Sequence, residues 1–557
     1  MKFLIMNWQN IKQFLAKDAW FYLLWLVFGL FLLQNGFAYL DNDFGWHLGV
    51  GKEIMKSGQV PWVESHLYTL AGTTWVDHEW MFNAFVYLVY TYLGYFFLQL
   101  IFVAIILLPL LLLYNYKIAH FKFERFWFMF FAGLGIFACR AHFGVRLQEI
   151  ALLNITILLV LLDRFVKNKN FTYLFWLIPL FIFWANMHAS FLLGLAVLYG
   201  WLVIKIVESI LAKYSNSLKF INFNYLLSKI EIFKYSMVVV LITISTLLTP
   251  YGLKLYDFLF TYTDKYYLSH IEEWLPEFVG PSLKLGRISL FLVFIVSLLV
   301  LTLFQKKYKP SIPFPQITFL YFILVIGLIF SSLMVRRNLP ILFIIGLPWL
   351  AYFYTIEFGV LSENFFSLSW LKKIYKFFIF TPIILLIFGL ILKISLVSDP
   401  FKSYCGYMPC TLTVELKKIL SNSEGKLFAS YDWGGFLYWV WPERQLYLDG
   451  RVPQQYFGKH SILEEYNKII YETGGLKKLE RQGVKAILYK KKVELKPTKI
   501  DEWLFGFNAN QYNKKAVQLQ EDLKNSQLWQ NVYNDRFGEI YIKKDDTSSK
   551  NLKACKT

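Results

Sequence analysis

Long apolar runs dominate residues 1–397 of the chain. Two of them, Ala19 to Leu40 and Phe96 to Leu113, approach the ~20 residues that a helix needs to cross a bilayer. Counting such runs by length predicts about eleven spanning helices. The fold class expected from this pattern is a polytopic α-helical membrane protein.

One apolar run, Phe82 to Tyr116, is too long for a single straight crossing. We expect an interfacial helix up to about Leu93, followed by one span. Two crossings would place the basic residues from Lys117 to Arg125 outside, against the positive-inside rule.

The pattern changes near Asp399, where long apolar runs stop and amphipathic patterning begins. Short apolar segments alternating with helix-like stretches predict an α/β domain. The expected strands are Lys426 to Ala429, Gln445 to Leu448, Val484 to Tyr489 and Glu539 to Ile542, and the expected helices are His460 to Tyr471 and Val517 to Ser526. The predicted parts are a transmembrane catalytic domain at 1–397 with a first outer loop at 41–80, an exported domain at 398–545 and a polar tail at 546–557.

Composition agrees with a membrane protein, because 57% of residues are hydrophobic and only 17% are charged, against about 25% in average globular chains. The formal charge of +19 would suggest nucleic acid in a soluble protein. Here the basic residues cluster in short connections, as the positive-inside rule requires of cytoplasmic loops. We therefore expect the lipid bilayer and no nucleic acid as a partner.

The same rule predicts the topology in the cell membrane, which is the inner or plasma membrane. The amino terminus is expected in the cytoplasm and the last domain on the extracytoplasmic side. The first apolar run is long enough to remain as a span, so we expect no cleavable signal peptide. Cys405 and Cys410 follow the last predicted span on the outer side, where a disulfide is permitted. Two unpaired thiols are equally compatible with the sequence.

The first outer loop is denser in acids and histidines than any other predicted loop. Ionisable groups at the rim of a membrane are costly and tend to mark function. The residues concerned are Asp41, Asp43, His47, Glu64, His66, Asp77, His78 and Glu79.

Asp41 and Asp43 stand two positions apart at the outer end of a span, where an extended backbone would point both carboxylates to one side. The pair could hold a divalent metal such as Mg or Mn against a phosphate leaving group, or one carboxylate could act as a base. The alternative is a solvated acidic turn. Asp77, His78 and Glu79 return to the membrane surface at the far end of the loop and favour the catalytic interpretation.

The motif D-x-D-x-x-W-H-L, followed by G-x-V-P and the run Asp77-His78-Glu79-Trp80, resembles the GT-C superfamily, membrane glycosyltransferases that use polyprenyl-phosphate-linked sugars. The pattern is more narrowly similar to a bacterial branch with further signatures. These are WANMHASFLLG at Trp184 to Gly194, TPYG at Thr249 to Gly252, IEEW at Ile271 to Trp274, RRNLP at Arg336 to Pro340, and DWGG with LDGR at Asp432 to Arg451. The resemblance implies that Asp41 or Asp43 is the catalytic acidic residue.

Candidate substrate-binding residues lie in the first outer loop, in the other predicted outer turns and in the last domain, and each has a structural alternative. Arginines could clamp a phosphate or snorkel toward lipid headgroups, a hairpin histidine could only pack helices together, and an acidic pair could be solvated. The candidates are His47, Arg140, Arg146, Asn186, His188, Glu272, Glu273, Arg336, Arg337 and Asp432.

Two segments of the last domain are candidates for the acceptor side. Asp432 lies in a segment that is similar, though with a different order, to the acceptor-reading motif of the oligosaccharyltransferase catalytic subunit. Its glycines are also compatible with a turn that needs positive φ. Asp449, Gly450 and Arg451 follow a predicted strand, which is a usual place for a ligand-facing loop. Local pairing of Asp449 with Arg451 is the alternative.

The function expected is inverting transfer of a sugar from a polyprenyl-phosphate donor to an extracytoplasmic glycan, lipid or protein acceptor. One alternative is an oligosaccharyltransferase or polysaccharide ligase that moves a preassembled glycan. A transporter or flippase, or a catalytically inactive homologue, are alternatives of a different class. A transporter is expected to carry ionisable residues within its spans and inverted repeats, and neither is evident.

Overall fold

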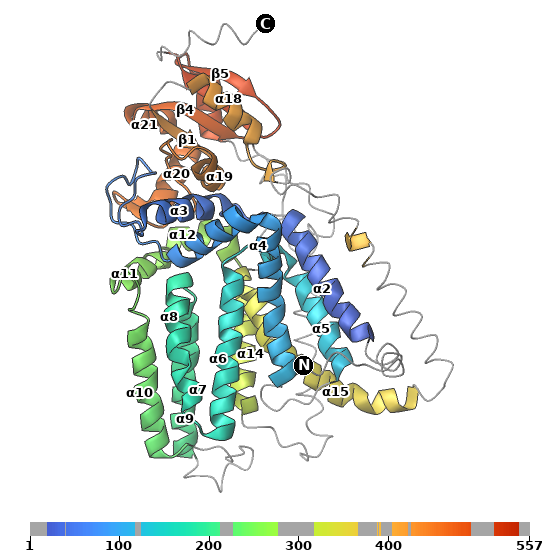
Figure 1. Cartoon of the computed structure of the whole chain (residues 1–557). Coiled ribbons are helices and arrows are strands. Elements are labelled where there is room, and N and C mark those ends of the chain that lie inside the picture. The colour runs from blue at the N-terminus through green and yellow to red at the C-terminus, as the bar shows by residue number, and fades with distance from the viewer. Residues whose placement is uncertain are drawn as a thin grey trace.

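The computed structural model describes residues 19–38, 40–116, 124–211, 227–276, 317–365, 387, 389–391, 404–420, 425–491 and 517–544. A bundle of long helices carries a smaller sheet-containing domain over one of its ends (Figure 1). Shorter helices from the first outer loop and from the segment after α10 lie between the two parts (Figure 1). The predicted polar tail and the charged connections at 117–123 and 212–226 lie outside the described residues.

The helices of the bundle follow the apolar runs of the sequence, since a helix satisfies its backbone groups internally when no water is present. They are α2 (Ala19–Ala38), α4 (Trp80–Tyr116), α5 (Arg125–Ala138), α6 (Gln148–Asn168), α7 (Thr172–Phe175), α8 (Leu177–Met187), α9 (Phe191–Leu211), α10 (Lys229–Ser245), α14 (Ile317–Met334) and α15 (Leu339–Phe365). Within the described ranges, 4 helices are long and apolar enough to cross a membrane. The predicted count of about eleven spans stays a prediction.

Helix α4 breaks at Gly94, whose φ of 79° and ψ of 173° are not helical. Glycine adopts positive φ without the penalty that a Cβ brings. The part before Gly94 lies across the end of the bundle, and the part after it runs along the other helices (Figure 1). The break falls where the sequence predicts that an interfacial helix ends and a span begins.

Short elements connect these helices at the end of the bundle that faces the sheet domain. The first outer loop forms α3 (Phe44–Ser57), and the chain after α10 forms α11 (Lys254–Phe260), η4 (Thr261–Thr263), α12 (Lys265–His270) and η5 (Glu272–Trp274). The turns η2 (Arg140–His142) and η6 (Arg336–Asn338) complete this layer. The disulfide between Cys405 and Cys410 forms, with a Cα–Cα distance of 5.4 Å.

The carboxyl-terminal domain, which the sequence predicts to be exported and which keeps the name exported domain below, is built on a mixed sheet. The strand order is β1-β4-β6-β5, in which β1 pairs parallel with β4 and the other pairs are antiparallel. Its strands are β1 (Lys426–Ala429), β2 (Tyr456–Phe457), β3 (His460–Ser461), β4 (Val484–Lys490), β5 (Trp529–Asn534) and β6 (Gly538–Lys543). Its helices are α18 (Cys410–Leu420), α19 (Gly434–Val440), α20 (Ile462–Tyr471), α21 (Gly475–Arg481) and α24 (Gln518–Asn525), and the turn η7 (Tyr431–Trp433) precedes α19. The α/β prediction is confirmed for this region.

The strand predicted at Gln445 to Leu448 is wrong, because only Leu446 makes β-bridges there. Leu446 pairs with Leu427 of β1 on one side and with Leu67 of the first outer loop on the other. The apolar segment is therefore buried between two parts of the protein and does not extend the sheet. It is one of the contacts that attach the exported domain to the loop.

Candidate functional site

The two aspartates of the first outer loop lie at the start of α3 and have different surroundings. The Asp41 carboxylate accepts a hydrogen bond from the backbone N–H of Asp43 at 3.0 Å. Its other oxygen lies 2.5 Å from Nε of Arg146, which follows η2. Asp41 is therefore held in an ion pair.

The Asp43 carboxyl is half-buried and lies against the exported domain. A Cβ added to Gly450 would lie 2.6 Å from Oδ1 of Asp43, and one added to Gly435 would lie 2.7 Å from the carbonyl oxygen of Asn42. These glycines, from the LDGR and DWGG motifs, let the backbone of the exported domain approach closely. Burial first, and then the neighbouring Asp41 carboxylate, raise the pKa of Asp43 well above its usual range.

Arg146 also contacts Glu273 of η5, with Nη1 3.1 Å from Oε1. Gln148 donates a hydrogen bond to the other oxygen of Glu273 at 3.2 Å. Burial opposes ionisation of Glu273, but the guanidinium groups of Arg337 and Arg146 outweigh it and lower the pKa of Glu273 to about 2. Arg146 therefore bridges Asp41 and Glu273, which are far apart in the sequence.

The arginine and glutamate pairs predicted from sequence meet, because η5 and η6 pack together. Arg336 is buried, donates to Glu272 at 2.9 Å and also donates to the carbonyl of Pro276. Arg337 lies 3.9 Å from Glu273 and packs over the ring of Trp274. Arg336 thus joins the two turns, while Arg337 reaches the same carboxylate as Arg146.

At the far end of the loop, Asp77, His78 and Glu79 lie buried at the start of α4. Asn83 donates to both oxygens of Asp77, at 3.1 and 2.9 Å, and its own oxygen lies 2.6 Å from Nδ1 of His47. Because an amide oxygen only accepts hydrogen bonds, Nδ1 of His47 carries the proton. This contact joins α3 to α4 and leaves Nε2 of His47 as an acceptor.

The charges of this buried group are set by burial and by its neighbours. Burial raises the pKa of Asp77 to about 6. For Glu79, burial opposes ionisation, but His78 at 3.1 Å lowers the pKa to about 2. Burial, and then the charge of Arg337, lower the pKa of His188 to about 3, so this histidine is neutral. Glu79 is therefore an ionised carboxylate.

The hairpin between α8 and α9 contributes one residue to the buried group and one to the scaffold. His188 shares a hydrogen bond of 2.7 Å with Ser190. Asn186 accepts from the indole of Trp80 and donates to the carbonyls of Ile182 and Leu248. All these Asn186 contacts are within the protein, so it positions the start of α4 rather than presenting a free amide.

Two predicted residues do not join the cluster. Asp432 is exposed and pairs with Lys490 of β4 at 2.5 Å. Arg140 is exposed and its guanidinium packs over the ring of Phe137. Both positions are consistent with surface roles, which matches the structural alternatives that the sequence allowed.

The LDGR motif forms a buried ion triad with the first outer loop. Arg451 binds Asp449 through two nitrogens and lies 3.1 Å from Glu64, and the exposed fractions of both carboxylate side chains are 0%. The guanidinium lies 4.5 Å from the ring centres of both Trp75 and Tyr438. The local Asp449–Arg451 pair is thus confirmed, and it extends to a partner that the sequence did not reveal.

Sequence reasoning also missed Asn83 as a member of the cluster. It lies four residues after Glu79 on α4 and is completely buried. A polar residue one turn after an acidic motif, inside an otherwise apolar helix, is the signal that could have identified it.

The expected metal site does not form from the described side chains. The Asp41 carboxylate is bonded to Arg146 and to a backbone N–H. Across the part of the chain that the structure describes, no group of three or more histidine, cysteine, aspartate or glutamate residues is arranged to share an ion. Divalent metals need several oxygen or nitrogen ligands, so this donor set does not fit one.

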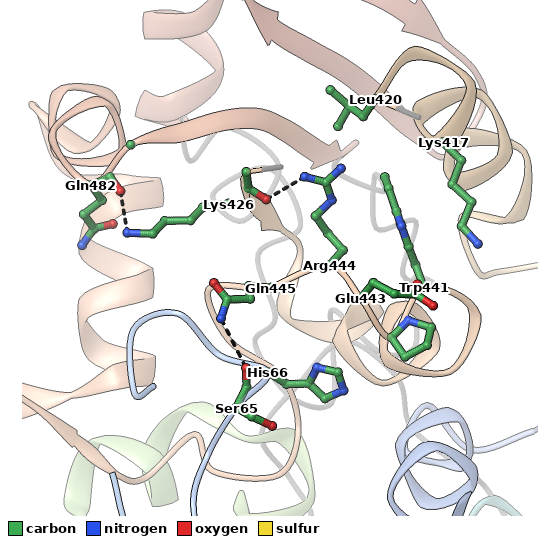
Figure 2. Close-up of a pocket in the computed structure, with 13 residues that line it drawn as sticks. Ser65, His66, Lys417, Leu420, Lys426, Trp441, Glu443, Arg444, Gln445 and Gln482 are labelled. Atoms are coloured by element: carbon green, nitrogen blue, oxygen red, sulfur yellow. Dashed lines mark hydrogen bonds between the residues drawn. The ribbon is translucent and has the colours of Figure 1, made fainter. Parts of the chain in front are cut away.

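A pocket of about 1090 Å³ lies on the seam between the first outer loop and the exported domain (Figure 2). Gln445 donates to the carbonyl of Ser65 across this seam at 3.3 Å. Lys426 and Arg444 donate to backbone carbonyls of the pocket wall (Figure 2). The described residues that line it also include Trp441 and His66, a histidine of the first outer loop, but none of the candidate catalytic or substrate-binding residues.

Comparison with known proteins adds information about the fold. No protein-family model matches the sequence, and no curated protein matches it significantly. Solved structures do match. One is the Archaeoglobus fulgidus oligosaccharyltransferase tethered to an acceptor peptide containing the NVT sequon, with a TM-score of 0.51 and 12% identity over 86% of this chain and 70% of that chain.

The apo form of the same oligosaccharyltransferase gives a TM-score of 0.50 and 12% identity, over 85% of this chain and 70% of that chain. Similarity at this level of identity concerns the fold. It extends over both the helical bundle and the exported domain, which agrees with the resemblance seen in the sequence. The chain therefore shares the fold of the archaeal oligosaccharyltransferase.

Proposed function

We propose that the chain is a membrane glycosyltransferase that moves a sugar from a polyprenyl-phosphate-linked donor to an extracytoplasmic acceptor. The observation that carries this proposal is the gathering of Asp41, Asp43, Arg146, Glu273 and Arg337 on a GT-C fold. These residues come from separate turns, and elements at one end of the bundle hold them together. Acids and arginines that served only to hold the fold together would not need to converge beside the partly exposed carboxyl of Asp43.

Asp43 is the better candidate for the base. Both oxygens of the Asp41 carboxylate already have partners, Arg146 on one and the backbone N–H of Asp43 on the other. Asp43 has a raised pKa, and a base works best when its pKa approaches the working pH. The exported domain covers Asp43 through Gly450, so acceptor binding and the base meet at the same boundary.

In the proposed reaction, the hydroxyl oxygen or amide nitrogen of the acceptor attacks the anomeric carbon of the sugar, and Asp43 accepts the proton that this atom loses. The bond from this carbon to the phosphate oxygen breaks, and the polyprenyl phosphate leaves from the opposite face with its bonding electrons. The configuration at the anomeric carbon therefore inverts. Arg337 stabilises the charge of the leaving phosphate, because guanidinium binds phosphate oxygens through two hydrogen bonds.

The buried group around Glu79 has a different role in this proposal. Its neutral His188 and protonated Nδ1 of His47 provide polar contacts without additional positive charge. Arg337 interacts electrostatically with His188 and with Glu79 of this group. We assign them to orienting the donor sugar and phosphate, on the extracytoplasmic face of the cell membrane.

A second candidate function is transfer of a preassembled glycan, as in an oligosaccharyltransferase. The structural match to an enzyme tethered with an acceptor peptide favours this version. The two versions use the same acids and differ in the size of the transferred group. Mass measurement of the product distinguishes them, because a single sugar adds one hexose or pentose mass and a glycan adds several.

The activity can be tested with the full-length protein in nanodiscs that contain labelled lipid-linked sugars from its source membranes. Label is expected to move from the lipid fraction into an acceptor fraction, and Asp43→Asn is expected to stop this movement. Asp522→Asn is a matched control, since Asp522 lies on α24 of the exported domain and bonds to Gln518. Consumption of labelled lipid at equal rates by wild type and Asp43→Asn would refute the proposal, and movement of intact lipid-linked sugar across the membrane would favour a flippase.

A further inference from the structure

The guanidinium of Arg146 lies between two acids that come from different outer loops, Asp41 and Glu273. Nε lies 2.5 Å from Asp41 and Nη1 lies 3.1 Å from Glu273. Asp41 belongs to the first outer loop and Glu273 to the later outer loop, so only the fold brings them to one cation. Arginine suits this place because its planar group carries five donors and keeps its charge at every physiological pH.

The surroundings keep Arg146 in this position. The neighbouring Gln148 donates to the second oxygen of Glu273, so this carboxylate is bonded on both sides. Burial opposes the charge of Arg146, but Asp41 first and then Glu273 raise its pKa above the usual range. The side chain is 21% exposed, so it is not fully enclosed by the protein.

A divalent cation at the same place would meet a fixed positive charge. It would have to displace Arg146 from both carboxylates or bind beside it, and like charges at such a distance repel strongly in a partly buried site. Arg337 adds a second positive group 3.9 Å from Glu273. The acids of this cluster are therefore already compensated by cations that belong to the chain.

We infer that Arg146 takes the place of a divalent metal in this site, so that the protein binds and transfers its substrate without one. The inference rests on the proposed glycosyl transfer only for its catalytic part. Its structural part, that Asp41 and Glu273 bind a guanidinium instead of a metal ion, can be measured without turnover. Phosphate groups of the donor would then contact Arg146 and Arg337 directly.

The test uses the full-length protein in detergent. Bound metal is first removed exhaustively with EDTA, and Mn²⁺ binding is then measured by electron paramagnetic resonance. Wild type is expected to bind no stoichiometric Mn²⁺ and to keep its melting temperature in EDTA. Arg146→Met removes the charge while keeping an unbranched side chain. Without the guanidinium, the Asp41 and Glu273 carboxylates have no cation between them, and water can supply the remaining ligands of a divalent ion. This variant is therefore expected to gain one Mn²⁺ equivalent that wild type does not bind, and to melt at a higher temperature with Mn²⁺ than without.

Controls make the result decisive. Arg481→Met, at the exposed end of α21, is expected to behave as wild type, and Arg146→Lys is expected to bind no Mn²⁺ because it retains a positive charge. One bound Mn²⁺ in wild type would overturn the inference, and this measurement needs no variant. Folded Arg146→Met that gains no Mn²⁺ would also overturn it. Sugar transfer by wild type only when a divalent metal is supplied would overturn the inference as well. Failure of transfer both with and without metal, in wild type with no bound Mn²⁺, would count against the proposed function instead.

Discussion

Removing the positive charge of Arg451 is expected to destabilise the exported domain strongly. Arg451→Met leaves Glu64 and Asp449 facing each other, and both of these side chains are fully buried. Breaking a buried ion pair by removing one partner typically costs about 3–5 kcal/mol.

The melting temperature of full-length protein, followed by tryptophan fluorescence, measures this effect. For a unit the size of the exported domain, ~3–5 kcal/mol corresponds to a decrease of about 6–20 °C. Arg481→Met is the control, since that side chain is exposed. The variant in which Glu64→Gln and Asp449→Asn accompany Arg451→Met is expected to recover part of the loss, because no uncompensated charge remains.

The contradicting outcome is a small effect. A decrease in melting temperature of less than about 2 °C in Arg451→Met would show that the ion triad does not stabilise the folded protein.

Two further outcomes concern Asp43. Gly450→Ala is expected to lower the transfer rate at least ten-fold with little change in melting temperature, because the new Cβ would lie 2.6 Å from Oδ1 of Asp43. Gly200→Ala is the control, since a Cβ there meets nothing within 4 Å. Equal activity of the two variants would contradict the contact between Gly450 and Asp43. Burial and the neighbouring Asp41 raise the pKa of Asp43 above the usual carboxyl range near 4. The transfer rate of wild type is therefore expected to fall as pH decreases through this raised pKa. A rate that stays constant down to pH 4.5 would show that Asp43 does not act as the base.

The sequence was informative where charged or polar residues stand in an otherwise apolar chain. Asp41 and Asp43, together with the acids and histidines at the far end of the loop, stand out because such groups are costly near a membrane. The break at Gly94 was predictable from the length of the apolar run. These features depend on local pattern and bilayer thickness, so a single sequence contains them.

Features that depend on tertiary contacts could not be predicted. The sequence treats Arg336 and Arg337 alike, yet one joins two turns and the other reaches Glu273. Strand β5 was missed because most of its residues are polar or partly exposed, as an edge strand allows. Apolar content wrongly indicated a strand at Leu446, which is buried between the loop and β1.

The distinction between the two aspartates likewise came only from the fold. Both are acidic residues of one motif, and the sequence offered no reason to choose between them. The structure places Arg146 on Asp41 and the backbone of Gly450 against Asp43. Neither partner is near the motif in the sequence.

The most direct test of the account is a comparison of single-turnover transfer by wild type, Asp41→Asn and Asp43→Asn in nanodiscs with labelled lipid-linked sugar. Loss of a general base lowers the rate by about 10²–10⁴-fold, and we expect a decrease of this size for Asp43→Asn. Asp41→Asn is expected to lose less, because its main contact is the ion pair with Arg146. Transfer by Asp43→Asn within about ten-fold of wild type, in protein with an unchanged melting temperature, would contradict the account.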